Sequence, residues 1–340
     1  MSVQSETTVA TPSVARSDAL LEVRGLTTEL RLRRGAFNAV DDVSFTVDHG
    51  EIVGIVGESG CGKSMTALTL MQLLPAAARV KTGHALLDGT DLLSLSDRQM
   101  RRVRGKEISM VFQEPMTSLD PAFTIGDQII ETVRAHERVG KEEARNRAVQ
   151  ILERVGIPNA ARRAEDYPHQ FSGGMRQRVM LAIALVMRPK LVIADEPTTA
   201  LDVTIQAQIL ELIVELQREL GLSVVLITHN LGVVHEVADR VAVMYAGEIV
   251  ETASVRELFD DPQHPYTQGL LRSMPVLATR GRHLPVIPGR VPELSELPPA
   301  CRFAPRCANR IARCDASHPA LLTKGASREL RCYNPTPFSR

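Results

Sequence analysis

Apolar residues along this 340-residue chain follow two patterns. Residues 20–53 alternate apolar and polar positions, as in Leu21-Glu22-Val23, and such alternation predicts antiparallel strands with one buried face. Short continuous apolar runs rich in β-branched residues predict fully buried strands instead. These runs lie at residues 52–56, 108–112, 191–194 and 223–227. The chain therefore combines an antiparallel β subdomain with the buried strands of an α/β core.

Helical periodicity dominates residues 125–185. Its breaks lie at Gly140, Gly156 and Pro168. A helical stretch of this kind between two buried strands predicts an insertion into the core, which we place at about residues 115–188. A further long helix is predicted over residues 203–220, behind the third buried strand.

Composition divides the chain into three parts. Residues 1–18 are polar and predict a disordered tail, and residues 19–257 carry the strand and helix patterns of one folded domain. From residue 258 onward prolines become frequent, which disfavours long helices and strands. We therefore expect residues 258–340 to form a C-terminal extension that packs on this domain or on a partner.

Charge and hydropathy exclude several classes of protein. Lysine plus arginine and aspartate plus glutamate both number 40, so no strong positive field indicates nucleic acid as a partner. No apolar segment approaches the ~18–20 residues that a membrane-spanning helix needs. The polar start of the chain lacks the apolar core of a signal peptide. We expect a cytoplasmic protein that reaches a membrane only through its partners.

A cradle for nucleotide phosphates is predicted directly behind the first buried strand, at residues 57–64. Its glycines let successive N–H groups point at a triphosphate, and the following helix adds the positive end of its dipole. Lys63 can reach the β- and γ-phosphates, and Ser64 offers its hydroxyl to Mg²⁺. A chance glycine turn is the alternative, but the required strand–loop–helix context is present. The nucleotide-binding residues expected here are Gly57, Ser59, Gly60, Cys61, Gly62, Lys63, Ser64 and Met65.

Polar residues follow the other buried strands, at Gln113, at Asp195-Glu196 and at His229. Two carboxylates buried at a strand tip are costly unless a cation and an ordered water offset their charge. Asp195 suits coordination of Mg²⁺, and Glu196 suits orienting or deprotonating an attacking water. A lone glutamine or histidine is usually structural, but Gln113 and His229 follow strands at the edge where α/β sheets bind ligands.

Two features allow both a structural and a functional interpretation. Ser172 is a candidate N-cap of the helix that follows, and Gly173 and Gly174 leave the next N–H groups uncovered. This arrangement suits either a simple helix cap or a second anion-binding site. Phe37 is the aromatic candidate to stack on an adenine, although a strand residue packed into the sheet explains it equally well.

Together these residues resemble the ATP-binding cassette (ABC) family of transport ATPases. The matching elements are the phosphate loop, Gln113, the signature Ser172-Gly173-Gly174-Met175-Arg176-Gln177, Asp195-Glu196, Asp202 and His229. The resemblance implies a head-to-tail dimer with two ATP molecules between its subunits. Half of each site would then arrive only when the dimer closes, which ties hydrolysis to a conformational cycle.

The family also implies a role for each matching residue. Ser172, Gly173 and Gly174 would contact the ATP held by the partner subunit. Gln113 would contact Mg²⁺ or the attacking water and relay the nucleotide state to membrane subunits. His229 would hold the γ-phosphate, and Asp202 would communicate across the dimer.

The C-terminal part narrows the resemblance to the ATPases of oligopeptide and dipeptide importers. The similar stretches are His264-Pro265-Tyr266-Thr267, Ile287-Pro288-Gly289, residues 301–307 and residues 193–210. Nickel importers and some sugar importers share this architecture, so the cargo stays open at this point.

Four of the five cysteines crowd the C-terminal part, at Cys301, Cys307, Cys314 and Cys332. Four thiolates suffice for zinc or for an iron–sulfur cluster, and the absence of a C-x2-C pair makes a zinc ribbon less natural. The resemblance favours a 4Fe–4S cluster, with metal-free reduced cysteines as the alternative. Cys61 stands alone in the phosphate loop, as a small filler or, if exposed, as a reactive thiol.

The resemblance thus implies an ATP-hydrolysing subunit of a di- or oligopeptide importer, peripheral on the cytoplasmic face of the membrane. Its expected partners are a second and different ABC ATPase subunit, two membrane-spanning permease subunits and an extracytoplasmic peptide-binding protein, with no nucleic acid. Two rival functions are a cassette ATPase without a transport role and an ATPase that senses metal through its cysteines.

Overall fold

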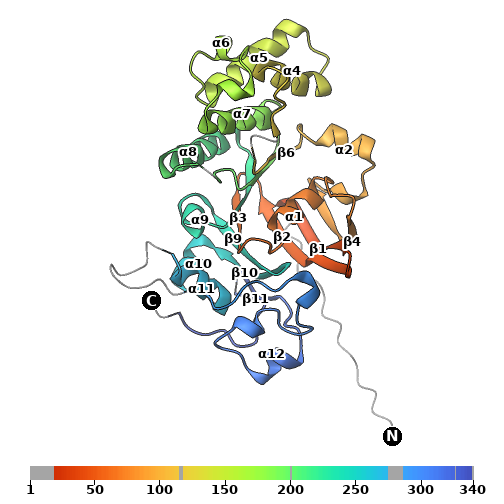
Figure 1. Cartoon of the computed structure of the whole chain (residues 1–340), viewed down its shortest axis with the longest axis vertical. Helices are drawn as coiled ribbons and strands as arrows, with labels where there is room; N and C mark the ends of the chain where they lie inside the picture. Colours follow the sequence, from red (N-terminus) through yellow and green to blue (C-terminus); the bar gives the residue numbers. More distant parts are fainter. Residues whose placement is uncertain (1–18, 115–117, 200, 275–285, 326, 339–340) are drawn as a thin grey trace.

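The computed structural model of the chain describes residues 19–114, 118–199, 201–274, 286–325 and 327–338. The predicted tail, residues 1–18, lies outside the described residues. Figure 1 shows the two ends of an elongated molecule: the helical insertion lies at one end and the C-terminal extension at the other.

Four strands form an antiparallel sheet in the order β2-β1-β4-β5. They are β1 (Ala19–Leu32), β2 (Gly35–Asp48), β4 (Ala78–Leu87) and β5 (Thr90–Asp91). Leu21 of β1 pairs with Val47 of β2 and with Leu87 of β4, so apolar side chains gather on one face. That face is buried against residues of the core sheet such as Ile55, which confirms the antiparallel subdomain predicted from the alternation.

The core sheet has the order β11-β12-β10-β9-β3-β8-β7-β6. Its strands are β3 (Ile52–Val56), β6 (Ile108–Val111), β7 (Leu191–Asp195), β8 (Ser223–Thr228), β9 (Arg240–Tyr245), β10 (Glu248–Ser254), β11 (Leu322–Lys324) and β12 (Arg328–Leu330). Strands β6, β7, β8, β3 and β9 are parallel. Their carboxyl ends therefore meet along one edge, where α/β sheets bind ligands.

Helices surround this sheet. They are α1 (Lys63–Leu70), α2 (Asp97–Val103), α4 (Ile125–His136), α5 (Lys141–Arg154), α6 (Ala160–Arg163), α7 (Gly173–Leu185), α8 (Val203–Leu220), α9 (Leu231–Val237), α10 (Val255–Asp260), α11 (Pro265–Arg272) and α12 (Ala312–Ala316). Short 3-10 helices include η1 (Leu92–Ser94), η2 (Pro168–Gln170), η4 (Leu294–Glu296) and η5 (Ala304–Arg306). In the described part of the chain, no helix is long and apolar enough to span a bilayer.

Helices α4 to α7 form the predicted insertion (Figure 1). Buried residues of α7, such as Val179 and Leu181, share one hydrophobic cluster with Val192 and Val224 of the core sheet. The insertion is therefore seated on the sheet through α7.

The C-terminal extension contains short helices and strands and is joined to the core sheet. Strand β12 pairs antiparallel with β10, and β11 pairs with β12, so the extension continues the core sheet at its edge. The aromatic rings of Tyr245, Tyr266 and Phe303 pack in one cluster that joins β9 to the extension. The extension therefore packs on the nucleotide-binding domain as expected, and the helices and strands described in it are short, with α12 five residues long and β11 and β12 three residues each.

Candidate ATP site

The phosphate loop leaves β3 at Val56 and enters α1 at Lys63, as the strand–loop–helix pattern predicts. Gly60 and Gly62 have φ angles of 80° and 105°, in the region that favours glycine. A Cβ atom on Gly62 would lie 2.6 Å from the carbonyl oxygen of Ala39. The backbone curl of this loop therefore depends on glycine at position 62.

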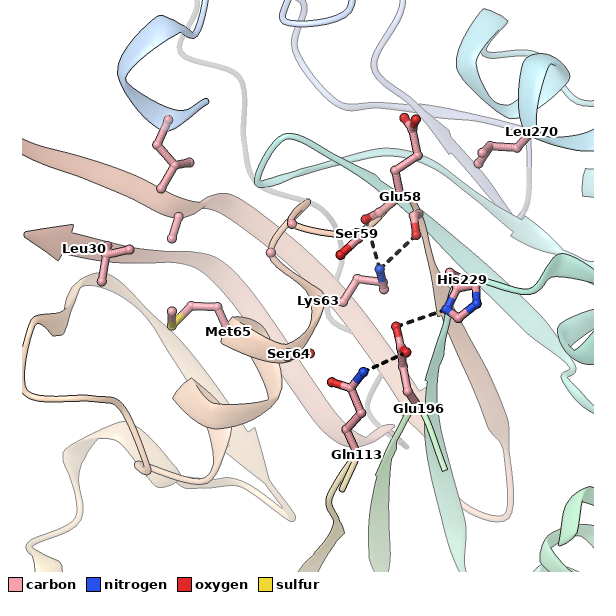
Figure 2. A pocket seen from close by; sticks show the side chains of 15 residues that line it. Leu30, Glu58, Ser59, Lys63, Ser64, Met65, Gln113, Glu196, His229 and Leu270 are labelled. Atoms are coloured by element: carbon pink, nitrogen blue, oxygen red, sulfur yellow. Dashed lines mark hydrogen bonds and ion pairs between the residues drawn. The ribbon is translucent and has the colours of Figure 1, made fainter. Parts of the chain in front are cut away.

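Lys63 is held inside the curve of the loop. Its side chain is buried, and its Nζ donates to the carbonyl oxygens of Gly57 at 2.8 Å and of Glu58 at 3.1 Å (Figure 2). An ammonium at this position supplies positive charge where a triphosphate would lie. Cys61 is fully buried behind the loop, and burial raises the pKa of its thiol. A buried, protonated thiol fits the small-filler interpretation of Cys61 and not the reactive one.

Ser64 and Asp195 form the candidate magnesium position. The Ser64 hydroxyl donates to Asp195 Oδ1 at 3.0 Å. This hydrogen bond joins the first turn of α1 to the tip of β7. Asp195 is 4% exposed, and burial raises the pKa of its carboxyl. A divalent cation would offset that desolvation, and hydroxyl and carboxylate oxygens are the ligands that Mg²⁺ prefers. These two residues therefore fit the metal.

Glu196 stands at the point where β7 turns out of the sheet. Its φ of 46° is unusual for a non-glycine residue, and its N–H donates to the Ile227 carbonyl of β8 at 2.9 Å. Its carboxylate accepts from Thr199 Oγ1 at 2.8 Å and from Gln113 Nε2 at 3.1 Å, and it lies 3.2 Å from His229 Nδ1 (Figure 2). Burial raises the pKa of Glu196, but the hydrogen bonds from Thr199 and His229 outweigh burial and leave that pKa below its ordinary value.

Glu196 is therefore ionised at neutral pH, and an ionised carboxylate among polar groups can accept a hydrogen bond from a water and orient it. The Glu196 side chain lies in the same pocket as that of Lys63 (Figure 2). Gln113 from the end of β6 and His229 from the end of β8 converge on it, as their strand-end positions predict.

A cavity of about 670 Å³ joins these elements. Ten of the predicted site residues line it: Gly57, Ser59, Gly60, Gly62, Lys63, Ser64, Met65, Gln113, Glu196 and His229. Leu30, Ala39, Glu58, Leu270 and Leu294 also line it and were not predicted. Glu58 was visible within the loop motif, but no local sequence signal distinguishes the other four.

The remaining predicted residues lie outside this cavity lining. Phe37 lies in β2, opposite Leu30 of β1, and it is Leu30 that lines the cavity. Adenine stacking by Phe37 therefore stays a prediction that this geometry does not support.

The signature residues form a second surface. Ser172 Oγ caps α7 by accepting from Met175 N at 3.4 Å, and Asp202 caps α8 by accepting from Ile205 N at 2.9 Å. The two caps are close together, because a Cβ atom on Gly174 would lie 2.7 Å from Ile205 Cγ2. The starts of α7 and α8 are thus close together, and none of Ser172, Gly174 and Asp202 lines the cavity at the phosphate loop.

The four C-terminal cysteines are all free thiols in one region. Burial raises the pKa of Cys332 to about 11, with smaller contributions from the neighbouring Cys307, Cys301 and Cys314. The backbone N–H of Cys301 donates to the carbonyl of Cys314 at 3.1 Å. Within the described residues, however, no group of three or more His, Cys, Asp or Glu side chains is arranged to hold a metal ion. The predicted metal centre is therefore not formed by the thiols as they are placed.

A lysine-bearing glycine loop that faces two consecutive acids at the tip of a nearby parallel strand, β7, defines a P-loop nucleoside triphosphatase. The family model described as ABC transporter matches residues 40–199, and the model described as oligopeptide/dipeptide transporter, C-terminal region, matches residues 250–314. The chain belongs to the ABC transporter family of ATPases, with a C-terminal region of the oligopeptide/dipeptide transporter type.

Relatives and solved structures agree with this assignment. A putative peptide import ATP-binding protein of Brucella melitensis is 52% identical over 325 residues, covering 92% of this chain and 96% of the relative. The oligopeptide transport ATP-binding protein AppD of Bacillus subtilis is 51% identical over 315 residues, covering 92% and 96%. The ATP-binding cassette MJ0796, solved as a dimer bound to ADP and phosphate, has a TM-score of 0.63 and 28% identity, covering 69% of this chain and 99% of that one.

Proposed function

We propose that this ATPase drives import of di- or oligopeptides, peripherally at the cytoplasmic face of a membrane. The observation that carries the proposal is the C-terminal region at residues 250–314, whose family model is described as oligopeptide/dipeptide transporter. Relatives at 50–52% identity are named for peptide or dipeptide transport, which supports the same cargo class. Such a system includes two membrane-spanning permeases, a substrate-binding protein outside the membrane and a second ATPase subunit, which we expect to be a different chain.

The polar residues of the site divide the chemistry among them in this proposal. Ser64, Asp195 and Gln113 would hold Mg²⁺, which would offset the negative charge of the triphosphate. Lys63 and the loop N–H groups orient the triphosphate. Glu196 orients the attacking water and accepts its proton as the bond between the β,γ-bridging oxygen and the γ-phosphorus breaks.

The signature surface has no ATP of its own in this proposal. Ser172, Gly173 and Gly174 would contact ATP bound by the partner ATPase, and Asp202 would lie at the dimer contact. None of these residues lines the cavity of this chain, which supports an arrangement in which they serve the ATP of the partner.

The test is uptake of a labelled dipeptide by cells that carry the intact chain or Glu196→Gln, with labelled Ni²⁺ as a parallel cargo. We expect Glu196→Gln to retain ATP binding, to lose hydrolysis by about 10²–10⁴-fold, and to abolish peptide uptake alone. Glu211→Gln, an exposed carboxylate on α8, is the matched control and should change neither activity. Loss of Ni²⁺ uptake alone would keep the ATPase and replace the cargo, and unchanged uptake of both would favour the ATPase without a transport role.

We further propose that Cys301, Cys307, Cys314 and Cys332 together bind a 4Fe–4S cluster. The proposal rests on the four thiols, which lie near one another in the extension, and on the four cysteine ligands that such a cluster takes. Protein isolated without oxygen should contain iron and sulfide in equal amounts and absorb visible light, and Cys314→Ser should lose both. Zinc without sulfide would support the alternative metal, and metal-free protein would reject the cluster.

A further inference from the structure

The C-terminal extension contacts the phosphate loop at Glu58. Arg306, which precedes Cys307, donates from Nη1 to Glu58 Oε2 at 2.7 Å and from Nη2 to Glu58 Oε1 at 3.0 Å. The two parallel hydrogen bonds make a bidentate ion pair, which is geometrically selective as well as strong. The Arg306 side chain is only 5% exposed, so this contact is not an ordinary surface ion pair.

The backbone of Glu58 is held by the same extension. Its N–H donates to the hydroxyl of Tyr266 at 2.9 Å, and Tyr266 is fully buried at the start of α11. The carbonyl oxygen of Glu58 accepts from Lys63 Nζ at 3.1 Å. Side chain and N–H are thus fixed from the extension, while the carbonyl is fixed by the lysine expected to bind phosphate.

Arg306 is itself pre-oriented. Its Nε donates to the Pro288 carbonyl at 2.8 Å, and its guanidinium lies 5.7 Å from the centre of the Tyr245 ring. Because these contacts come from the extension and from β9, the arginine does not depend on Glu58 for its position. Leu270 and Leu294 of the extension also line the cavity, so the extension borders the nucleotide site at several points.

We propose that Arg306 is a positioning residue of the ATP site, which holds the phosphate loop in its binding conformation by pairing with Glu58. A loop that is already curved loses less conformational freedom when it binds a triphosphate, and pre-organisation of this kind raises affinity. The pair also neutralises the Glu58 carboxylate, which would otherwise repel the phosphates. This inference deepens the ATP-binding part of the proposed function and does not depend on the cargo.

The test is a double-mutant cycle on nucleotide affinity in the full chain. ATP carrying a fluorescent label on its ribose is titrated into the intact chain, Arg306→Gln, Glu58→Gln and the double variant. We expect Arg306→Gln to weaken binding about tenfold in the intact background, the usual order for loss of one charge-assisted pair. In the Glu58→Gln background the same change should weaken binding less than about twofold, because its partner is already gone.

Two further variants separate positioning from structural support. Arg310→Gln removes an exposed arginine of the extension that pairs with Asp315, and it should leave ATP affinity unchanged. Arg306→Lys keeps the charge but not the fork, so it should recover part of the affinity lost in Arg306→Gln. If Arg306→Gln does not fold, Arg306→Lys is carried through the same cycle.

The proposal is overturned if Arg306→Gln leaves ATP affinity unchanged, or if it weakens binding by the same factor in both backgrounds. The first result would make the pair a docking contact only, and the second would mean that Arg306 acts by another route than Glu58. Because peptide uptake is not measured, failure of this inference is distinct from failure of the cargo assignment.

Discussion

Arg302 ties the C-terminal extension to the turn between β9 and β10, and replacing it with methionine should destabilise the fold. Its Nε lies 3.1 Å from Glu248 Oε1, its Nη1 donates to the Ala246 carbonyl at 2.6 Å, and it also pairs with Asp41. The side chains of Arg302 and Glu248 are 11% and 4% exposed. The pair is therefore largely out of water.

The expected loss follows from what Arg302→Met leaves behind. Removing one partner of a buried ion pair costs about 3–5 kcal/mol, because the other charge stays buried without compensation. His318 keeps its Nε2 at 2.8 Å from Glu248 Oε1, so one partner remains. We therefore expect the lower end of that range, about 3 kcal/mol. Arg310→Met breaks the ion pair between Arg310 and Asp315, whose side chains are 49% and 46% exposed. It should lower the free energy of unfolding by less than about 1 kcal/mol.

The assay is the free energy of unfolding from urea titrations of both variants and the intact chain at neutral pH. A third variant, Arg302→Met with Glu248→Gln, should recover part of the loss because the unpaired buried charge is removed. The reasoning is refuted if Arg302→Met is no less stable than Arg310→Met. It is also refuted if adding Glu248→Gln lowers stability further.

Three other predictions follow from the same geometry. Gly62→Ala should weaken ATP binding by at least about tenfold, because its Cβ would clash with the Ala39 carbonyl. Gly221→Ala adds a Cβ with no atom within 4 Å and should leave ATP affinity unchanged. Equal ATP affinities of the two variants would contradict the expected clash. Burial lowers the pKa of His264 from 6.5 to about 3, so its contribution to stability is full above pH 6.5 and is lost as the pH falls toward 3. His264→Asn should therefore reduce the loss of unfolding free energy between pH 7 and pH 5 by about 2 kcal/mol, and an unchanged pH dependence would argue against a neutral buried histidine. Cys61 should resist maleimide at pH 7 until urea unfolds the chain, and rapid labelling of native protein, detected by peptide mapping, would disprove its burial.

The chemistry of the site could be predicted because its residues occupy positions that sequence can locate. Gln113, Glu196 and His229 each follow a buried strand, and parallel strands bring their carboxyl ends to one edge. Lys63 and Ser64 begin α1 directly behind the glycine loop, and the spacing of the glycines and the lysine in this motif is set by the phosphates that the loop binds. Local pattern and site geometry therefore agree for these five residues.

The contacts of the extension could not be predicted in this way. Arg306 and Glu58 are separated by 248 positions, and no periodicity links an arginine in a cysteine-rich segment to a glycine loop. Leu294 lies in a 3-10 helix of three residues, and β11 and β12 are equally short. Elements of that length carry too few positions for a period of 2 or 3.6 to appear.

The hydrophobic core crosses residue 258, where the composition of the chain changes. The rings of Tyr245 and Tyr266 lie 4.7 Å apart, and those of Tyr245 and Phe303 lie 5.2 Å apart. A chain ending at residue 257 would expose Tyr245, leave β10 as an open sheet edge, and remove both groups that hold Glu58. Because the turn after β9 also contacts the loop, with Gly247 N donating to the Cys61 carbonyl at 2.8 Å, these losses would reach the phosphate loop from two directions. The extension is therefore a structural component of the nucleotide site in this chain.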